Sequence, residues 1–307
     1  MARTRVLAAE SRRPGHSETH AALSLSARMP RLILEARRVT ATLTHGLHGR
    51  RRAGAGETFW QFRPFVTGEA AGRVDWRRSA RDDRLYVRER EWEAPHAIWL
   101  WVDRSASMAF ASDLADAPKI ERALVIGLAL ADTLVEGGER VGLMGRTRPS
   151  ATRRIIETVA ASYGLPGPDQ DDDLPPDARL GRLDEVLLIG DFLVPLDELV
   201  PRIETLSAGG ARGHLLMVVD PVEETFPFAG QAILHELEAG LSLRIGDAAS
   251  WGEAYRTRIG AHRAAIADLC RRRGWTLTIH HTDRPASEAA LRVLTLVAGA
   301  GRAGAGA

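Results

Sequence analysis

The chain has 307 residues, a hydrophobic content of 45% and a formal net charge of +1. This length fits one large domain or two modest ones, and the near-neutral charge argues against a chain-wide basic surface for nucleic acid. Cys270 is the single cysteine, which excludes an internal disulfide and fits a reducing compartment. Lys119 is the single lysine among 41 basic residues, and we interpret this as coding bias rather than phosphate recognition.

The N-terminal part of the chain is basic. Residues 1–27 are polar, rich in arginine and without period, so we expect them to be disordered. They contain no apolar secretory signal, and no stretch of the chain reaches 18 apolar residues, so we expect no transmembrane segment and a cytoplasmic location. Residues 1–52 hold 11 arginines against 3 acidic residues, which leaves nucleic-acid binding through this segment, without sequence specificity, as a third and less favoured interpretation.

The next region predicts a small helix-plus-strand segment over residues 28–96. A helix is expected from residue 30 to residue 44, because apolar residues recur on one stripe. The residues of this stripe are Leu32, Ala36, Val39 and Leu43. Alternating side chains in "RLYVRERE" (84–91) predict a strand.

From residue 97 to residue 298, apolar runs alternate with helical periods. Strands are predicted at 98–102, 140–144, 186–190, 214–219 and 275–280, and helices at 118–136, 150–162, 195–207, 250–273 and 286–298. Strands this apolar must be covered on both faces, so the predicted fold is α/β, with a mostly parallel sheet between helices. The low-complexity residues 299–307 predict a disordered tail.

Two of the predicted strands end in a carboxylate, Asp103 in one case and Asp191 in the other. Ser105 and Ser107 follow Asp103 at alternate positions. Ligands of open parallel sheets bind at the carboxyl ends of the strands, and an all-oxygen set suits Mg²⁺, with Mn²⁺ or Ca²⁺ as alternatives. Serine and aspartate are also common turn and capping residues, which is the alternative interpretation.

The segment "DRSAS" (103–107) resembles the metal-ion-dependent adhesion site (MIDAS) of von Willebrand factor A domains. Such a site also has a threonine after the second strand, for which Thr152 is the best candidate, with Ser150 and Thr147 behind it. "GAGETFWQFRPFVTGEAAGRVDWRRSARDDRLYVRERE" (54–91) is similar to the signature of the DUF58 family.

The DUF58 resemblance continues in "VVDPVEETFPF" (218–228) and "WTLTIHHTDRP" (275–285), so it covers residues 28–298. It implies a von Willebrand A-like (Rossmann-like) domain over residues 97–298. The sequence departs from the family at residues 68–70, where Gly-Glu-Ala stands for Gly-Asp-Asp, and at Gly72, where an arginine is usual.

The same resemblance implies a bacterial, chaperone-like adaptor that works beside a MoxR-type AAA+ ATPase in the assembly or maturation of a client. We therefore expect protein–protein interaction and no catalysis. The alternative is a metal-dependent phosphoester hydrolase using Asp103 and Asp191, although two-metal catalysis usually needs more carboxylates. No Gly-x-Ser-x-Gly elbow and no phosphate-binding glycine loop occurs in the sequence.

A second candidate surface precedes the main domain. Arg63, Arg81 and Arg88 are interleaved with aromatic residues, and arginine and aromatic residues dominate the energetic centres of protein interfaces. The alternative is an added β layer whose aromatic residues pack on a core and whose charges satisfy one another. We keep both interpretations of these three arginines.

Overall fold

The computed structural model describes residues 14–47, 59–66, 69–70, 72, 74–81, 84–90, 97–164, 173–235 and 242–304. The chain divides into two compact units. The larger unit consists of Met1–Gly49 together with His96–Ala307, and the smaller unit is Arg50–Pro95. Each unit is described by itself below.

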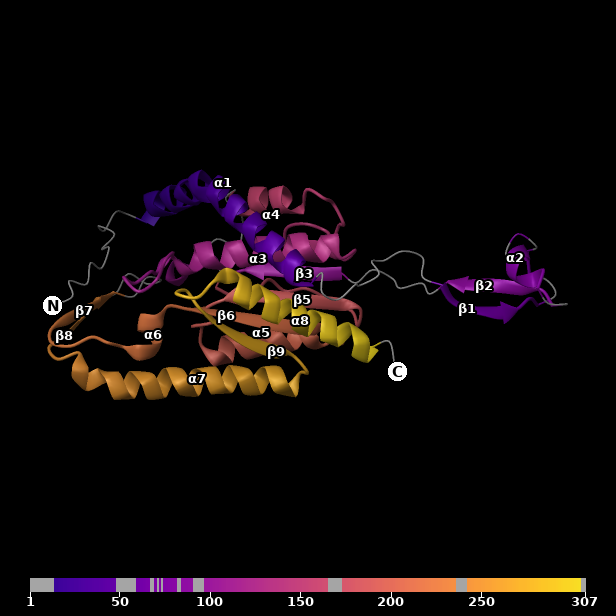
Figure 1. Cartoon of the computed structure of the whole chain (residues 1–307). Helices are drawn as coiled ribbons and strands as arrows, with labels where there is room; N and C mark the ends of the chain where they lie inside the picture. Colours follow the sequence, from indigo (N-terminus) through magenta and orange to yellow (C-terminus); the bar gives the residue numbers. More distant parts are fainter. Residues whose placement is uncertain are drawn as a thin grey trace. The chain divides into compact units, whose positions relative to one another are not determined.

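A five-stranded parallel sheet forms the centre of the larger unit (Figure 1). Its strands are β3 (Ala97–Val102), β4 (Arg140–Leu143), β5 (Asp184–Gly190), β6 (Arg212–Val219) and β9 (Thr276–His281), in the order β4-β3-β5-β6-β9. The chain passes from β3 to β4 on one side and then returns to β5 on the other side of β3. The strand order therefore reverses between β3 and β5, which is where open α/β sheets bind ligands.

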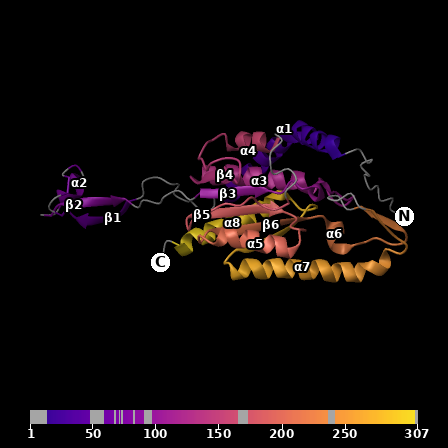
Figure 2. The ribbon, with the colours of Figure 1, turned by 180° about the vertical axis from the view of Figure 1, so that it is seen from behind.

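Helices cover both faces of this sheet, as the two opposite views show (Figures 1 and 2). Leu100 of β3 and Ile189 of β5 pack in one core with helices α1, α3, α4 and α8, whereas Trp101 and Leu188 pack in a second core with α5 and α7. The helices are α1 (Pro14–Leu47), α3 (Lys119–Glu136), α4 (Ile155–Gly164), α5 (Leu196–Ser207), α7 (Gly252–Arg272) and α8 (Ala286–Gly304). Neighbouring residues of a strand point to opposite faces, so the apolar runs fill both cores and the predicted α/β class is confirmed.

Helix α1 belongs to the larger unit. Its predicted apolar stripe is buried in the same core as α3, α4 and α8. The residues of the stripe are Leu32, Ala36, Val39 and Leu43. The structure thus differs from the predicted division at residue 97, because a periodic stripe shows that a helix face is buried but not what covers it.

Two helices extend beyond the predicted limits. Helix α1 begins at Pro14, inside the segment 1–27 expected to be disordered, and α8 continues to Gly304, inside the expected tail 299–307. Residues 1–13 and 305–307 lie outside the described residues. Within the described part of the chain, no helix combines the length and apolar character needed to cross a bilayer.

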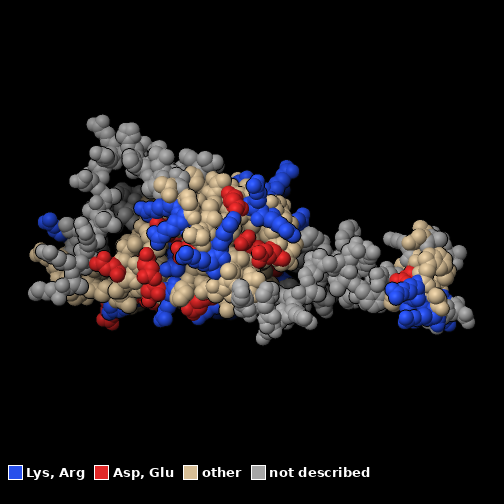
Figure 3. All heavy atoms as spheres, turned by 45° about the horizontal axis from the view of Figure 1, so that its top comes forward, with Lys and Arg blue, Asp and Glu red and all other residues tan. Residues whose placement is uncertain are grey.

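Shorter elements complete the two units. In the larger unit these are the turns η2 (Ala106–Ala109) and η3 (Ala249–Trp251), helix α6 (Pro221–Thr225) and the antiparallel pair β7 (Ala232–His235) and β8 (Ser242–Ile245). The smaller unit contains β1 (Phe59–Pro64), α2 (Trp76–Ser79) and β2 (Tyr86–Arg90), with β1 antiparallel to β2. Figure 3 shows basic and acidic side chains interspersed on one face of the larger unit, as the near-zero net charge leads one to expect.

Candidate metal centre

Asp103 and Asp191 lie side by side at the switch point of the sheet. Strands β3 and β5 are paired in parallel, with Val102 opposite Ile189, so the residues that follow them leave the sheet at the same edge. The backbone N–H of Asp103 donates to the carbonyl of Ile189 at 2.8 Å, which extends the ladder by one residue. The register of the two central strands thus positions the two carboxylates.

A chain of hydrogen bonds connects the four residues predicted to form the site. The backbone N–H of Ser105 donates to Oδ1 of Asp103 at 2.8 Å. This hydrogen bond forms an Asx turn at the start of the loop. The hydroxyls of Ser105 and Ser107 are 3.0 Å apart, and the Ser107 hydroxyl donates to Oδ2 of Asp191 at 2.7 Å. The turn η2 begins directly after Ser105 and holds both serines over the strand ends.

The second carboxylate oxygen of Asp103 is the least satisfied atom of this cluster. Asp103 is 1% exposed, and its Oδ2 receives no hydrogen bond from the described part of the chain. Burial, together with the nearby charge of Asp191, raises the pKa of Asp103 to about 8, against hydrogen bonds from Ser105 that lower it. A buried carboxylate whose charge lacks compensation binds a proton or a cation. The space beside Oδ2 of Asp103 therefore fits a positive ion.

Gly190 makes room for the Asp103 side chain. A Cβ atom at residue 190 would lie 2.8 Å from Cβ of Asp103 and 2.9 Å from its Oδ2, closer than such atoms approach in proteins. Glycine at the last position of β5 therefore lets Asp103 turn inward over the neighbouring strand. The sequence prediction did not include this residue, although its place directly before Asp191 in "LIGD" is visible there.

Lys119 and Glu223 also belong to the cluster, and the sequence prediction did not include them. The Lys119 ammonium donates to Oδ2 of Asp191 at 2.7 Å and to Oε1 of Glu223 at 2.5 Å. Burial alone would lower the pKa of Lys119, but the two carboxylates outweigh it and raise the pKa. Burial raises the pKa of Glu223, and the Lys119 ammonium opposes this. The only feature of the sequence that could have drawn attention to Lys119 is that it is the single lysine of the chain and follows Pro118 at the start of a predicted helix.

Asp220 follows β6, but its two carboxylate oxygens have structural partners. They accept hydrogen bonds from the backbone and hydroxyl of Ser112 at 2.8 and 2.6 Å and from the backbone of Val222 at 2.9 Å. The backbone N–H of Asp220 in turn donates to Oε2 of Glu223 at 2.9 Å, which completes a capping box at the start of α6. Asp220 therefore fixes the loop after β3 and the orientation of Glu223.

The structure does not bring Thr152 to this cluster, so its prediction as a ligand is wrong. Ser150 forms an antiparallel bridge with Val141, which shows that the chain folds back along β4 after its carboxyl end. Thr152 therefore lies level with the amino end of β4, at the opposite edge of the sheet from Asp103. Its hydroxyl accepts from the backbone of Arg154 at 3.3 Å, in the turn before α4.

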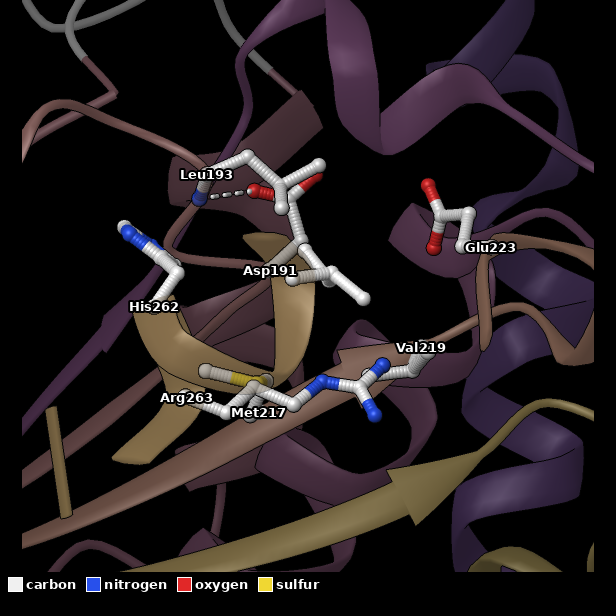
Figure 4. Close-up of a pocket in the computed structure, with 8 residues that line it drawn as sticks. Asp191, Leu193, Met217, Val219, Glu223, His262 and Arg263 are labelled. Carbon is white, nitrogen blue, oxygen red and sulfur yellow. Dashed lines mark hydrogen bonds between the residues drawn. The ribbon is translucent and has the colours of Figure 1, made fainter. Parts of the chain in front are cut away.

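A small pocket borders the cluster on the side of α7 (Figure 4). Asp191 and Glu223 line it together with His262 and Arg263, and its volume is about 10 Å³, which is room for one water molecule. Nowhere in the described residues do three or more His, Cys, Asp or Glu side chains form a metal cage. A cation held at Asp103 would thus be coordinated by serine hydroxyls and water beside the carboxylates, as Mg²⁺ commonly is.

The predicted arginine surface falls in the smaller unit. Arg63 forms two hydrogen bonds with the Glu69 carboxylate, one of them at 2.9 Å, so part of its charge is satisfied inside that unit. Arg81 is exposed, and the side chain of Arg88 lies outside the described residues. The Arg63 contact favours the structural interpretation for that residue, and partner binding by Arg81 and Arg88 stays a prediction.

Comparison with solved structures finds two similar chains from Bacteroides. The first is the conserved hypothetical protein BatB from Bacteroides thetaiotaomicron, with a TM-score of 0.40 and 14% identity over 66% of this chain and 99% of that one. The second is an aerotolerance-related membrane protein from Bacteroides fragilis, with a TM-score of 0.35 and 15% identity over 64% of this chain and 97% of that one.

Sequence comparison finds relatives in mycobacteria. The uncharacterized proteins Rv1480 of Mycobacterium tuberculosis and Mb1516 of Mycobacterium bovis are each 27% identical to the chain over 282 residues, which is 85% of this chain and 86% of theirs. Residues 61–265 match the family model described as "Protein of unknown function DUF58". This match spans more than half of the chain, and the protein therefore belongs to the DUF58 family.

Proposed function

We propose that this protein is a non-catalytic interaction module with a MIDAS-type magnesium site at the switch point of its sheet. The observation that carries the proposal is Asp103, a fully buried carboxylate with one oxygen that receives no hydrogen bond from the described residues. Serine hydroxyls stand next to it, and the second aspartate lies at the end of the neighbouring strand. This combination fits a hard cation better than a turn, because a turn leaves no carboxylate oxygen buried without a partner.

Asp103, Ser105, Ser107 and Asp191 would hold Mg²⁺, or Mn²⁺ or Ca²⁺ in its place. A bound ion of this kind supplies an attachment point for a carboxylate of another molecule. The two serines are neutral, so they offer oxygen atoms without cancelling the positive charge. The backbone N–H of Leu193 donates to Oδ1 of Asp191 at 3.1 Å and keeps that carboxylate turned toward the serines.

Apolar side chains in the loops that carry the site support an interaction surface. Leu114 lies in the loop after β3 and Leu193 in the loop after β5, and they are 57% and 44% exposed. In protein interfaces, contacts that contribute little energy themselves surround a central interaction and exclude water from it, and we propose this role for the two leucines. The proposed partner is a MoxR-type AAA+ ATPase, and the proposed role is that of an adaptor in assembly or maturation of a client complex. Both come from the family resemblance.

A binding measurement tests this function. The ATPase that co-purifies with the native protein is identified and its affinity for the full chain is measured in Mg²⁺ and in EDTA. We expect EDTA and Asp103→Ala each to weaken binding by about 2–5 kcal/mol, with no further loss when they are combined, because both remove the same interaction. Asp197→Asn, at an exposed position of α5, is the control and should leave the affinity unchanged.

Salt separates metal-bridged binding from electrostatic docking through the arginine-rich residues 1–52. Exposed charges are screened at high ionic strength, whereas a bridge through a buried site is screened much less. If the affinity is the same with and without EDTA but falls steeply as the salt concentration rises, the proposal is refuted. Phosphatase activity that needs Mg²⁺ and is lost in Asp103→Ala would instead favour the hydrolase.

A further inference from the structure

The Lys119 ammonium occupies the space between two carboxylates of the cluster. The side chain is 0% exposed and lies within hydrogen-bonding distance of both Asp191 and Glu223. Its backbone is fixed as well, because the N–H of Lys119 donates to the carbonyl of Phe110 at 3.1 Å, at the start of α3. The position of the ammonium is therefore fixed by the fold, unlike that of a flexible lysine on the surface.

The charged side chains of the cluster fall into two groups, one with its own cation and one without. On one side, the Lys119 ammonium donates hydrogen bonds to carboxylate oxygens of Asp191 and Glu223, and its charge offsets part of theirs. On the other side, Oδ1 of Asp103 accepts from the backbone N–H of Ser105, and Oδ2 receives no hydrogen bond from the described residues. Asp220 adds no free acceptor, since both its oxygens are used by Ser112 and Val222.

Oδ2 of Asp191 is the atom that the two halves share. It accepts from Ser107 on the Asp103 side and from Lys119 on the Glu223 side, at 2.7 Å in both cases. In two-metal sites a pair of ions stands about 3.5–4 Å apart and stabilises both the attacking and the leaving oxygen. An ammonium between Asp191 and Glu223 takes up the carboxylates that would hold the second ion of such a pair.

We propose that Lys119 acts as a resident cation in the second-ion position, so that the cluster admits a single divalent ion, on the Asp103 side. This inference deepens the proposed function and rests on its metal site. Lys119 would then determine how many metal ions the site binds. Its presence would distinguish this one-ion binding site from a two-ion hydrolytic site. Neutralising Lys119 should open the position between Asp191 and Glu223 to a second ion.

Counting bound Mn²⁺ tests the proposal, with electron paramagnetic resonance or isothermal titration calorimetry on the full chain. We expect one ion per chain for the wild type and two for Lys119→Ala, which removes the ammonium and leaves room for an ion. Arg122→Met is the matched control. Arg122 is a buried cation one turn further along α3 whose guanidinium donates to the carbonyl of Thr282, so its loss should leave the count at one.

A second variant keeps the test valid if Lys119→Ala folds poorly. Lys119→Met/Glu223→Gln removes one positive and one negative charge together, so it should fold without added metal and bind one ion. Lys119→Met alone leaves two buried carboxylates without their counter-ion. Its melting temperature in EDTA should fall by about 10 °C, and Mn²⁺ should restore most of this loss.

The outcomes separate this inference from the proposed function. A count of one ion in both the wild type and Lys119→Ala, without rescue of Lys119→Met by Mn²⁺, would overturn the role of Lys119 and leave the metal site standing. No ion in the wild type but one in Lys119→Ala would overturn the magnesium site and the one-ion stoichiometry, and would leave only the exclusion of an ion by the Lys119 ammonium. Two ions in the wild type would overturn the inference and favour a hydrolytic centre, and no ion in either protein would overturn both.

Discussion

The ammonium of Lys119 lies 2.7 Å from Oδ2 of Asp191, and the two side chains are 0% and 4% exposed. Breaking such a buried pair by removing one partner is costly, because the other charge stays buried without compensation. Asp103 is in the opposite situation, since one of its oxygens has no hydrogen-bond donor in the described structure. The two aspartates at the switch point should therefore respond differently to neutralisation.

Asp103→Asn should raise the free energy of unfolding in EDTA by about 1 kcal/mol, because it removes a poorly compensated buried charge. It should also abolish any stabilisation by Mg²⁺. Urea denaturation in EDTA and in Mg²⁺ measures both effects, with Asp197→Asn on the surface of α5 as the control. A loss of about 2–5 kcal/mol in EDTA, as for a deleted core side chain, would show that Asp103 is structural.

Gly190→Ala should destabilise the protein by about 1–3 kcal/mol and weaken metal binding, because the new methyl group would collide with the Asp103 side chain. Gly260→Ala is the matched control. No atom lies within 4 Å of a Cβ at this exposed position of α7, so the substitution should stabilise the helix by about 1 kcal/mol. Equal effects of the two substitutions on stability and on Mn²⁺ affinity would contradict the role of Gly190.

Leu32→Ala should lower the free energy of unfolding of the larger unit by about 2–5 kcal/mol, because Leu32 is 1% exposed in the core that α1 shares with α3. Leu34→Ala, on the same helix at 54% exposure, should change it by less than about 0.5 kcal/mol. Chemical denaturation followed by tryptophan fluorescence measures both. If Leu32→Ala leaves the free energy of unfolding unchanged, α1 does not contribute to the stability of this core.

Stability should fall as the pH is lowered below about 6.5, in part because of His280. Burial lowers the pKa of His280 to about 3, with Arg122 and His281 adding to the effect, and its Nε2 receives no hydrogen bond from the described residues. The unfolded state takes up a proton below its ordinary pKa of about 6.5 while the folded state stays neutral, so this contribution is complete above pH 6.5 and is lost toward pH 3.

Between pH 7.5 and pH 5.5 this one residue should account for about 1.4 kcal/mol of lost stability. His280→Leu should remove that part of the pH dependence. Thr278→Val, at a buried position of the same strand without a titratable group, should keep it. If urea denaturation gives the same slope with pH for the wild type and His280→Leu, the neutral buried state of His280 is refuted.

The strands and helices of the larger unit were predictable because each has a strong period or a continuous apolar run. Their ends moved by a few residues, as for α4, which begins at Ile155 and not at residue 150. The β7–β8 pair was not predicted, because two strands of four residues give too little alternation to be recognised. The assignment of α1 to the larger unit also required the structure, since the covering partner of a helix is a tertiary property.

The site was only partly predictable. Asp103 and Asp191 could be found because each directly follows an apolar run, and Ser105 and Ser107 because they follow Asp103 at alternate positions. Lys119 could not be assigned a partner, since a lysine at a helix start is usually solvated and Glu223 lies 104 residues away in sequence. Thr152 was misplaced because the fold-back along β4 depends on the bridge between Val141 and Ser150, which no local pattern indicates.

The central claim is that a divalent cation binds beside Asp103, and anomalous diffraction from crystals soaked in Mn²⁺ tests it most directly. We predict one peak among the oxygens of Asp103, Ser105, Ser107 and Asp191, with the Lys119 ammonium still on Asp191, and no peak there in Asp103→Asn crystals grown in the same form. A map with no peak at these oxygens at millimolar Mn²⁺, or with the same peak in Asp103→Asn, would contradict the account.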